Sequence, residues 1–139
     1  MKKAKLLALA LLMWGAGLLQ AQNLDHAYAL QTGKYDKYLK KWNWSKAEHV
    51  DLNFTFDGNY IKIHDEYGTR IYTYEDGGET TGYDDDGDRF SKRIWKSLDE
   101  KNKKCVFIMI WYSNIKLVTY TVMYSDYAFR YYITTQKEL

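Results

Sequence analysis

The sequence predicts an all-β domain, an antiparallel meander of about eight strands folded as a barrel or a sandwich. Three observations support this prediction. Short segments in which apolar and polar residues alternate follow one another along the chain, which is the pattern of strands with one wet face. The 14 tyrosines all lie from Tyr28 onward, and aromatic residues favour strands. The chain has no proline, so its turns must come from glycine, asparagine and aspartate.

Residues 1–21 are predicted to be a secretory signal peptide. Three lysines lie within the first five residues, an apolar run ends at Leu19, and small and polar residues follow. The apolar run is shorter than the roughly 20 residues that a membrane-spanning helix needs. Cleavage after Ala21 leaves residues 22–139 as a single all-β domain, which we expect to be secreted or periplasmic and to have no membrane span.

The composition of the mature chain argues against two classes of partner and one means of stabilisation. Loss of three lysines leaves 17 basic residues against 18 acidic ones, a net charge of −1. A nearly neutral chain gives no electrostatic reason to bind nucleic acid or an anionic membrane. The single cysteine, Cys105, has no partner for a disulfide within the chain and lies among apolar residues. We expect a buried thiol, with a reactive or intermolecular thiol as the alternative.

The N-terminal part of the domain fits two interpretations. Residues 25–31 are compatible with a strand or with one helical turn, and the aromatic residues between 35 and 44 fit either spacing. We favour short strands in both segments, because no other part of the domain shows a long helical pattern.

Period-two alternation predicts three strands in the first half of the domain. Apolar and polar residues alternate strictly over residues 50–56, and a glycine-containing turn at 57–59 leads into a strand at 60–65. A third strand is expected at 69–74. The glycines of residues 76–78 interrupt the pattern, so the strand is predicted to end before them.

The second half of the domain is more apolar. Strands are expected at residues 89–99, 104–112, 115–124 and 127–134. Residues 104–112 are apolar on both faces, which indicates a central strand or one that lies under a covering layer. Two-residue turns at 113–114 and 125–126 predict that the last three strands are antiparallel neighbours.

Aromatic residues are the strongest candidates for a binding site. Tryptophan and tyrosine combine an apolar ring with a polar group and dominate recognition surfaces. Alternatively, tyrosines on the wet face of a sheet stabilise cross-strand pairs without binding anything. The candidates for ligand binding are Trp42, Trp44, Tyr72, Tyr74, Tyr120, Tyr124 and Tyr132.

An acidic loop is the candidate for a metal site. Asp84, Asp86 and Asp88 cluster around a glycine, and calcium prefers carboxylate oxygens on a flexible loop. The loop is not an EF-hand, because its first and twelfth positions would be Gly82 and Arg93 where acidic residues are required. A weak calcium site and a solvated turn both remain open, and we expect no other cofactor.

Catalytic motifs are not recognisable in the sequence. Neither Gly-x-Ser-x-Gly nor His-Glu-x-x-His occurs, so we do not expect an enzyme. Of the three histidines, His49 and His64 lie on adjacent predicted strands, but a metal site needs three or four ligands, so we expect none here.

Several short motifs in the C-terminal half resemble those of a class of short exported bacterial proteins. They lie at residues 95–99, 104–105, 124–126 and 131–133. Members of this class pair a signal peptide with a β-rich domain. The resemblance therefore implies export and a β-sheet fold, and it brings no catalytic residues with it. Lipocalin-like barrels share the meander, but the early Gly-x-Trp signature of those barrels is missing here.

Three functional hypotheses follow from the sequence. The first is a non-catalytic, monomeric domain with a binding or structural role at the cell envelope, where its partner is a protein or a glycan. The second is a lipocalin-like carrier of a small apolar or aromatic ligand, which requires an internal cavity. The third is a secreted enzyme or inhibitor. The inward-facing positions of the predicted strands are large, which favours a packed interior over a carrier.

Overall fold

A computed structural model describes residues 25–134, and these residues form nine strands and no helix. The predicted signal peptide lies outside the described residues, as do residues 135–139. The strands are β1 (Asp25–Asp36), β2 (Lys41–Trp44), β3 (Glu48–Asp57), β4 (Tyr60–Asp65), β5 (Gly68–Tyr83), β6 (Arg89–Leu98), β7 (Lys104–Tyr112), β8 (Leu117–Met123) and β9 (Tyr127–Ile133). Within the described part of the chain, no helix has the length and apolarity needed to cross a membrane.

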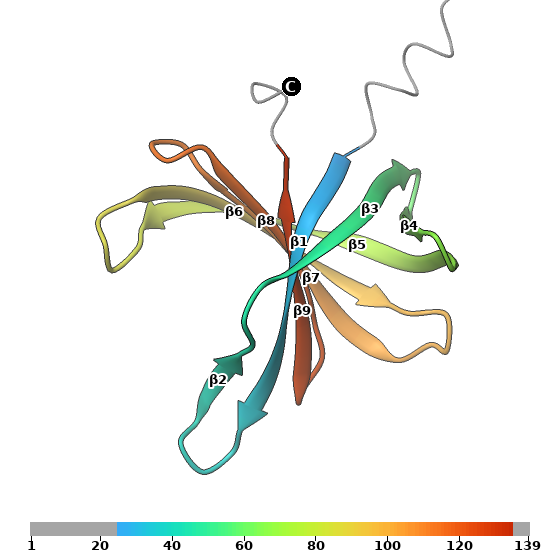
Figure 1. The fold of residues 1–139 in the computed structure, drawn as a ribbon, viewed down its shortest axis with the longest axis horizontal. Coiled ribbons are helices and arrows are strands. Elements are labelled where there is room, and N and C mark those ends of the chain that lie inside the picture. The colour runs from blue at the N-terminus through green and yellow to red at the C-terminus, as the bar shows by residue number, and fades with distance from the viewer. Residues whose placement is uncertain (1–24, 135–139) are drawn as a thin grey trace, which may run out of the picture.

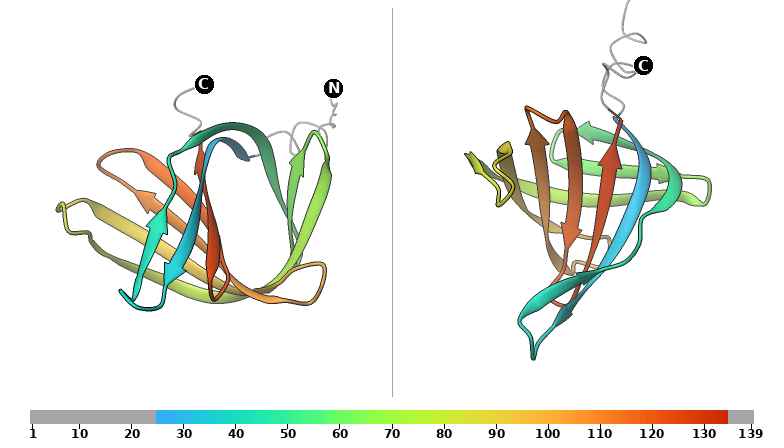
Figure 2. Two further views of the ribbon diagram at one scale, coloured as in Figure 1. Left: turned by 60° about the horizontal axis from the view of Figure 1, so that its bottom comes forward. Right: turned by 60° about the vertical axis from the view of Figure 1, so that its left-hand side comes forward.

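The strands form an antiparallel meander that closes into a barrel (Figures 1 and 2). Strands β3 to β9 follow one another in sheet order, and β1 lies between β3 and β9. Eight strands, β1 and β3 to β9, therefore make the closed barrel, which confirms the predicted all-β class and selects the barrel over the sandwich. The short β2 pairs with the far end of β1 and forms a hairpin that projects from the barrel (Figure 2).

Strand β1 pairs with three other strands. Along one edge its first half, Asp25 to Leu30, pairs with β3, and Gly33 to Asp36 pairs with β2. Along the other edge, residues 27–34 pair with β9. Both of the ladders that include Ala27 shift register between Ala27 and Ala29, which marks a bulge, and both continue beyond it. The change of partner from β3 to β2 comes later, between Leu30 and Gly33. The segment is a strand throughout, as favoured from its sequence.

Two predicted boundaries were wrong. Residues 76–78 do not end a strand, because β5 continues to Tyr83 and absorbs the glycines in a register shift between Asp76 and Glu79. The Cβ of any residue at Gly77 would lie 1.8 Å from the carbonyl oxygen of Ile94, so the close approach of β6 requires this glycine. The turn between β7 and β8 spans four residues, 113–116, and not two, because Tyr112 pairs with Leu117.

Aromatic rings fill the interior of the barrel. Phe54 and Tyr131 are fully buried, and their ring centroids lie 5.1 Å apart in an edge-to-face arrangement. Phe107 contacts the rings of Phe54 and Tyr120 at centroid distances of 6.4 and 5.6 Å, and Trp95 at 5.5 Å. Such pairs add to the stability gained by burial alone. The inward-facing positions are therefore large and packed, as the sequence predicted.

Strand β7 shows how the two faces of the barrel differ. Cys105, Phe107 and Met109 point inward and are buried. The alternate residues Val106 and Ile108 remain partly exposed on the outer face, although their sequence pattern resembles that of a strand buried on both sides. The expectation that both faces of residues 104–112 are covered is thus wrong for the described chain. The outer surface of the barrel here is apolar.

This difference predicts unequal effects of two neighbouring substitutions. Phe107→Ala should lower the free energy of unfolding by about 3–5 kcal/mol, because it opens a cavity in the aromatic core. Ile108→Ala, the control on the outer face, should cost less than half as much. Urea unfolding of the two variants measures both values. Equal losses would contradict the assignment of inner and outer faces on β7.

Candidate functional site

The seven aromatic residues predicted to bind a ligand do not form one surface. Tyr72, Tyr120 and Tyr124 point into the barrel and are only about 5–6% exposed. Tyr74 is also on the inner face, where its ring packs edge-on against Trp95 and its hydroxyl donates to the carbonyl of the β3–β4 turn. The remaining three, Trp42, Trp44 and Tyr132, lie on the outer face and are partly exposed.

The hydroxyl groups of the buried tyrosines find partners near the ends of the barrel. Tyr120 donates to Asp25 at 2.6 Å, and Tyr124 donates to Asp99 at 2.9 Å. Burial raises the pKa of both phenols, and the neighbouring acceptors raise it further. Burial raises the pKa of Tyr131 to about 12. These tyrosines stay neutral at any physiological pH. Their rings fill the interior of the barrel, and the hydroxyl groups of Tyr120 and Tyr124 are satisfied by hydrogen bonds.

The outer aromatic residues cluster where β2, β1 and β9 lie side by side (Figure 1). Trp44 pairs across the ladder with Gly33, whose missing side chain leaves room for the indole. The guanidinium carbon of Arg130 lies 3.7 Å from the Trp44 ring centroid, within the range of a cation–π contact. Trp42 continues the row, with its ring 6.0 Å from Trp44 and 5.4 Å from Tyr35.

Gln31 links the row of Trp44 and Trp42 to Tyr132, near the end of β9. Its side-chain oxygen accepts hydrogen bonds from the hydroxyl of Tyr132 and, at 3.4 Å, from Arg130. Its amide nitrogen donates to the carbonyl of Ser45, which fixes the amide orientation. Tyr132 in turn lies 6.4 Å from the ring of Tyr28. The side chains are thus held in place before any partner arrives.

Aliphatic residues extend the cluster across the outer face of the barrel. In register order, Tyr132 lies beside Thr119 and then Ile110, while Arg130 lies beside Thr121 and then Ile108. Both threonines are buried although they point outward, because their larger neighbours cover them. From this point we reserve the name outer face for this part of the barrel's outside. Its members are Tyr28, Gln31, Tyr35, Trp42, Trp44, Ile94, Ile108, Ile110, Thr119, Thr121, Arg130 and Tyr132.

A groove borders the outer face. It has a volume of about 890 Å³ and crosses the strands from β4 to β8. One wall includes Tyr60 and Leu98, and the other includes Val106 and Met123, two neighbouring rows of residues on the outside of the barrel. The second row lies next to Ile108 and Thr121 of the outer face. Lys96 and Lys104 also line the groove, so its apolar residues are interspersed with charged ones.

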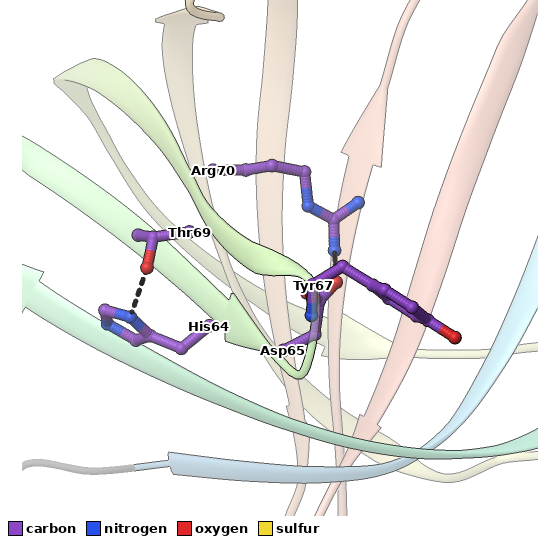
Figure 3. Close-up of polar contacts among 5 residues, drawn as sticks. All are labelled: His64, Asp65, Tyr67, Thr69 and Arg70. Carbon is purple, nitrogen blue, oxygen red and sulfur yellow. Dashed lines mark hydrogen bonds and ion pairs between the residues drawn. The ribbon is translucent and has the colours of Figure 1, made fainter.

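A second hollow, of about 720 Å³, lies beside the β4–β5 turn. Leu30, Val50 and Leu52 supply apolar lining, and Arg70 and Asp65 supply charge. Arg70 donates to Asp65 at 3.4 Å, and the backbone N–H of Tyr67 donates to the same carboxylate (Figure 3). On the outside of the barrel, the ring of His64 contacts the hydroxyl of Thr69 at 3.0 Å (Figure 3). It also contacts the hydroxyl of Thr55 at 3.0 Å.

The acidic loop is held by its own hydrogen bonds. Asp84 accepts the backbone N–H groups of Asp86 and Asp88 with one carboxylate oxygen, and Asn114 donates to Asp88 at 2.8 Å. Carboxylate oxygens of Asp84, Asp86 and Asp88 lie within 4.8 Å of one another, which is the only such group of possible metal ligands among the described residues. His49 and His64 do not belong to it. The geometry is that of an aspartate-stabilised turn.

Cys105 offers no nucleophile in the folded chain. Its thiol is buried, and this burial raises its pKa to about 11. A thiol that stays protonated at neutral pH is inert toward electrophiles. This placement matches the buried thiol expected from the sequence.

Comparison with protein-family models, with curated protein sequences and with solved structures gives no match to this chain. Sequence reasoning found Trp42, Trp44 and Tyr132 but missed Gln31 and Arg130. Arg130 and Tyr132 lie two residues apart on β9, a spacing that places both side chains on the same face of the strand. Only the strand register shows that β2 and β9 both pair with β1.

The contact between Trp44 and Gly33 can be tested with a double-mutant cycle. A Cβ at position 33 would lie 2.9 Å from the indole ring, so Gly33→Ala should destabilise the parent by about 1–3 kcal/mol. The same substitution in a Trp44→Ala background should cost less than about 0.5 kcal/mol. Urea unfolding of the four proteins measures the coupling. Equal costs in both backgrounds would show that the indole does not lie over Gly33.

The acidic loop gives a separate prediction. Asp84→Ala should lower the stability by about 1–2 kcal/mol, because two backbone N–H groups lose their acceptor. Asp86→Ala is the control and should change the melting temperature little. Thermal unfolding with and without calcium decides between turn and metal site. A calcium-dependent rise in the melting temperature of the parent, lost in Asp86→Ala, would establish a metal site.

Proposed function

We propose that this chain is an exported, non-catalytic β-barrel domain that binds a protein partner at the cell envelope through its outer face. The observation that carries the proposal is the network of Trp44, Arg130, Gln31 and Tyr132, which is ordered by internal contacts yet remains partly exposed. Side chains fixed before binding lose little entropy when a partner arrives.

The composition of the outer face supports a protein partner. Tryptophan, tyrosine and arginine are the residues that most often supply the binding energy of protein interfaces. Beyond Thr119 and Thr121 lie Ile108 and Ile110, whose partly exposed side chains add apolar surface, and exposed apolar patches mark interaction sites. A sheet surface of this kind is extended and gives a partner a broad area of contact. The predicted signal peptide supports export, and hence a location in the envelope or outside the cell.

A second candidate function rests on the hollow beside the β4–β5 turn. Arg70 is partly exposed, and its guanidinium contacts Asp65 at 3.4 Å and the hydroxyl of Tyr131. A guanidinium has five N–H donors, so these two contacts leave it able to bind an anion. Next to it are Leu30, Val50 and Leu52. This combination suits a small amphipathic anion, with its charged group on Arg70 and its apolar part on the aliphatic residues. The chain would then act as a carrier, with the ligand held at the barrel end and not in its packed centre.

Photo-crosslinking in intact cells tests the protein-binding proposal. A photoreactive residue at Ile110 should give one discrete adduct with another protein. The same residue at Lys62, on β4 and outside the outer face, should give none. Arg130→Lys keeps the charge but loses the planar stack on Trp44, and it should weaken the Ile110 adduct without unfolding the chain.

Two results would contradict the proposal. Adducts of equal yield at Ile110 and Lys62 would mean that the contacts are unspecific. No adduct at Ile110 in cells that export the folded protein would mean that the outer face has no protein partner. An adduct of twice the chain mass would identify the partner as a second copy of the chain.

A further inference from the structure

The tip of the β1–β2 hairpin exposes two apolar residues to solvent. Tyr38 is 96% exposed and Leu39 is 64% exposed. Their position is fixed, because a carboxylate oxygen of Asp36 accepts the backbone N–H groups of Tyr38 at 2.9 Å and of Leu39 at 3.0 Å. Lys40 closes the turn in the left-handed region, with φ of 53°. The tip is thus a structured turn that presents both side chains outward.

Five lysines lie along this hairpin or just after it. Lys34, Lys37, Lys40, Lys41 and Lys46 are all exposed, and within residues 32–47 the single acidic residue is Asp36. The carboxylate of Asp36 is engaged by the turn. The hairpin therefore carries a local charge of +4, although the predicted mature chain has a net charge of −1. This segment therefore has an excess of basic residues that the domain as a whole lacks.

The hairpin projects beyond the rest of the barrel, so its tip can contact a surface that the barrel itself does not touch. It extends beyond the neighbouring β8–β9 turn in Figure 2. Behind the tip, Tyr35 and Trp42 form an aromatic pair on one face of the hairpin. Trp44 and Arg130 then attach the hairpin to the barrel. In order from the tip, the hairpin therefore presents apolar side chains among lysines and then half-buried aromatic rings.

We propose that the β1–β2 hairpin docks the domain on an anionic phospholipid surface, with Tyr38 and Leu39 inserted among the lipid headgroups. Lysines near such a surface are attracted by its negative potential, and exposed apolar side chains gain by leaving water. Tyrosine and tryptophan settle at the boundary between headgroups and acyl chains, which matches the level of Tyr35 and Trp42. An acidic polysaccharide would satisfy the lysines but would leave the exposed Leu39 without a role.

Sedimentation with lipid vesicles tests this docking in the mature, full-length protein. The protein should bind vesicles of phosphatidylcholine with about one third phosphatidylglycerol, and should not bind phosphatidylcholine alone. Binding should fall sharply at about 0.5 M salt, where charge is screened within a few ångströms. Lys37→Gln/Lys40→Gln should weaken binding about 25-fold, at about fivefold per lysine. Lys92→Gln/Lys116→Gln, which removes the same charge away from the hairpin, should have little effect.

The insertion step has its own matched control. Tyr38→Ser/Leu39→Ser should weaken vesicle binding about tenfold or more, because the two side chains can no longer enter the lipid. Tyr67 is 89% exposed on the β4–β5 turn, and Tyr67→Ser should bind as the parent does. Tyr38, Leu39 and Tyr67 are all exposed, so circular dichroism and melting temperature should be unchanged in these variants. Unlike the outer-face variants, these leave Trp44, Arg130 and Tyr132 intact.

Three outcomes would overturn the proposal. Equal binding to neutral and anionic vesicles would remove the role of the lysines. A Tyr38→Ser/Leu39→Ser variant that binds as the parent does would show that nothing is inserted. Binding to alginate, an acidic polysaccharide, without binding to anionic vesicles would assign the hairpin to a glycan. The crosslinking at Ile110 is read out independently of all three.

Discussion

The closure of the barrel by β1 is the constraint on which the other features depend. A meander leaves two open edges, and unpaired edges invite aggregation. Here β1 pairs with β9 along one edge and shares its other edge between β3 and β2. On that edge the ladder with β3 ends at Leu30 and the ladder with β2 begins at Gly33. Beyond the β3 ladder, the end of β1 and β2 form the hairpin that projects from the barrel.

Closure also divides the aromatic residues between two roles. Inside, rings such as Phe54, Phe107 and Tyr131 pack edge to face and leave the centre of the barrel filled. Tyrosine can occupy this interior only where its hydroxyl finds an acceptor, which Asp25 provides for Tyr120. Outside, Trp44 contacts Arg130 and Tyr132 contacts Gln31, and these contacts are not part of the packed interior. The surfaces available for recognition are therefore the outer face, the hairpin and the ends of the barrel.

Much of the fold could be predicted from the sequence, because alternation and turn residues reveal strands directly. The division between inside and outside could not, since tyrosine suits both environments: Tyr72 and Tyr132 have similar sequence surroundings, yet one is buried and the other lies on the outer face. The apolar residues on both sides of β7 indicated a strand covered on both faces, but Ile108 belongs to an exposed apolar surface. The contact of Arg130 with Trp44 depends on the register of β9 against β1, which no local pattern encodes.

The central claim is that this domain has a packed interior and performs its function on its surface. Native mass spectrometry of the mature protein, purified from its own envelope and compared with its denatured mass, tests this claim most directly. We expect the bare mass of the chain, alone or with a protein partner that dissociates intact. A small-molecule mass excess that is lost on denaturation would rule out a purely surface function, and the domain would then be a carrier whose ligand site lies next to Arg70.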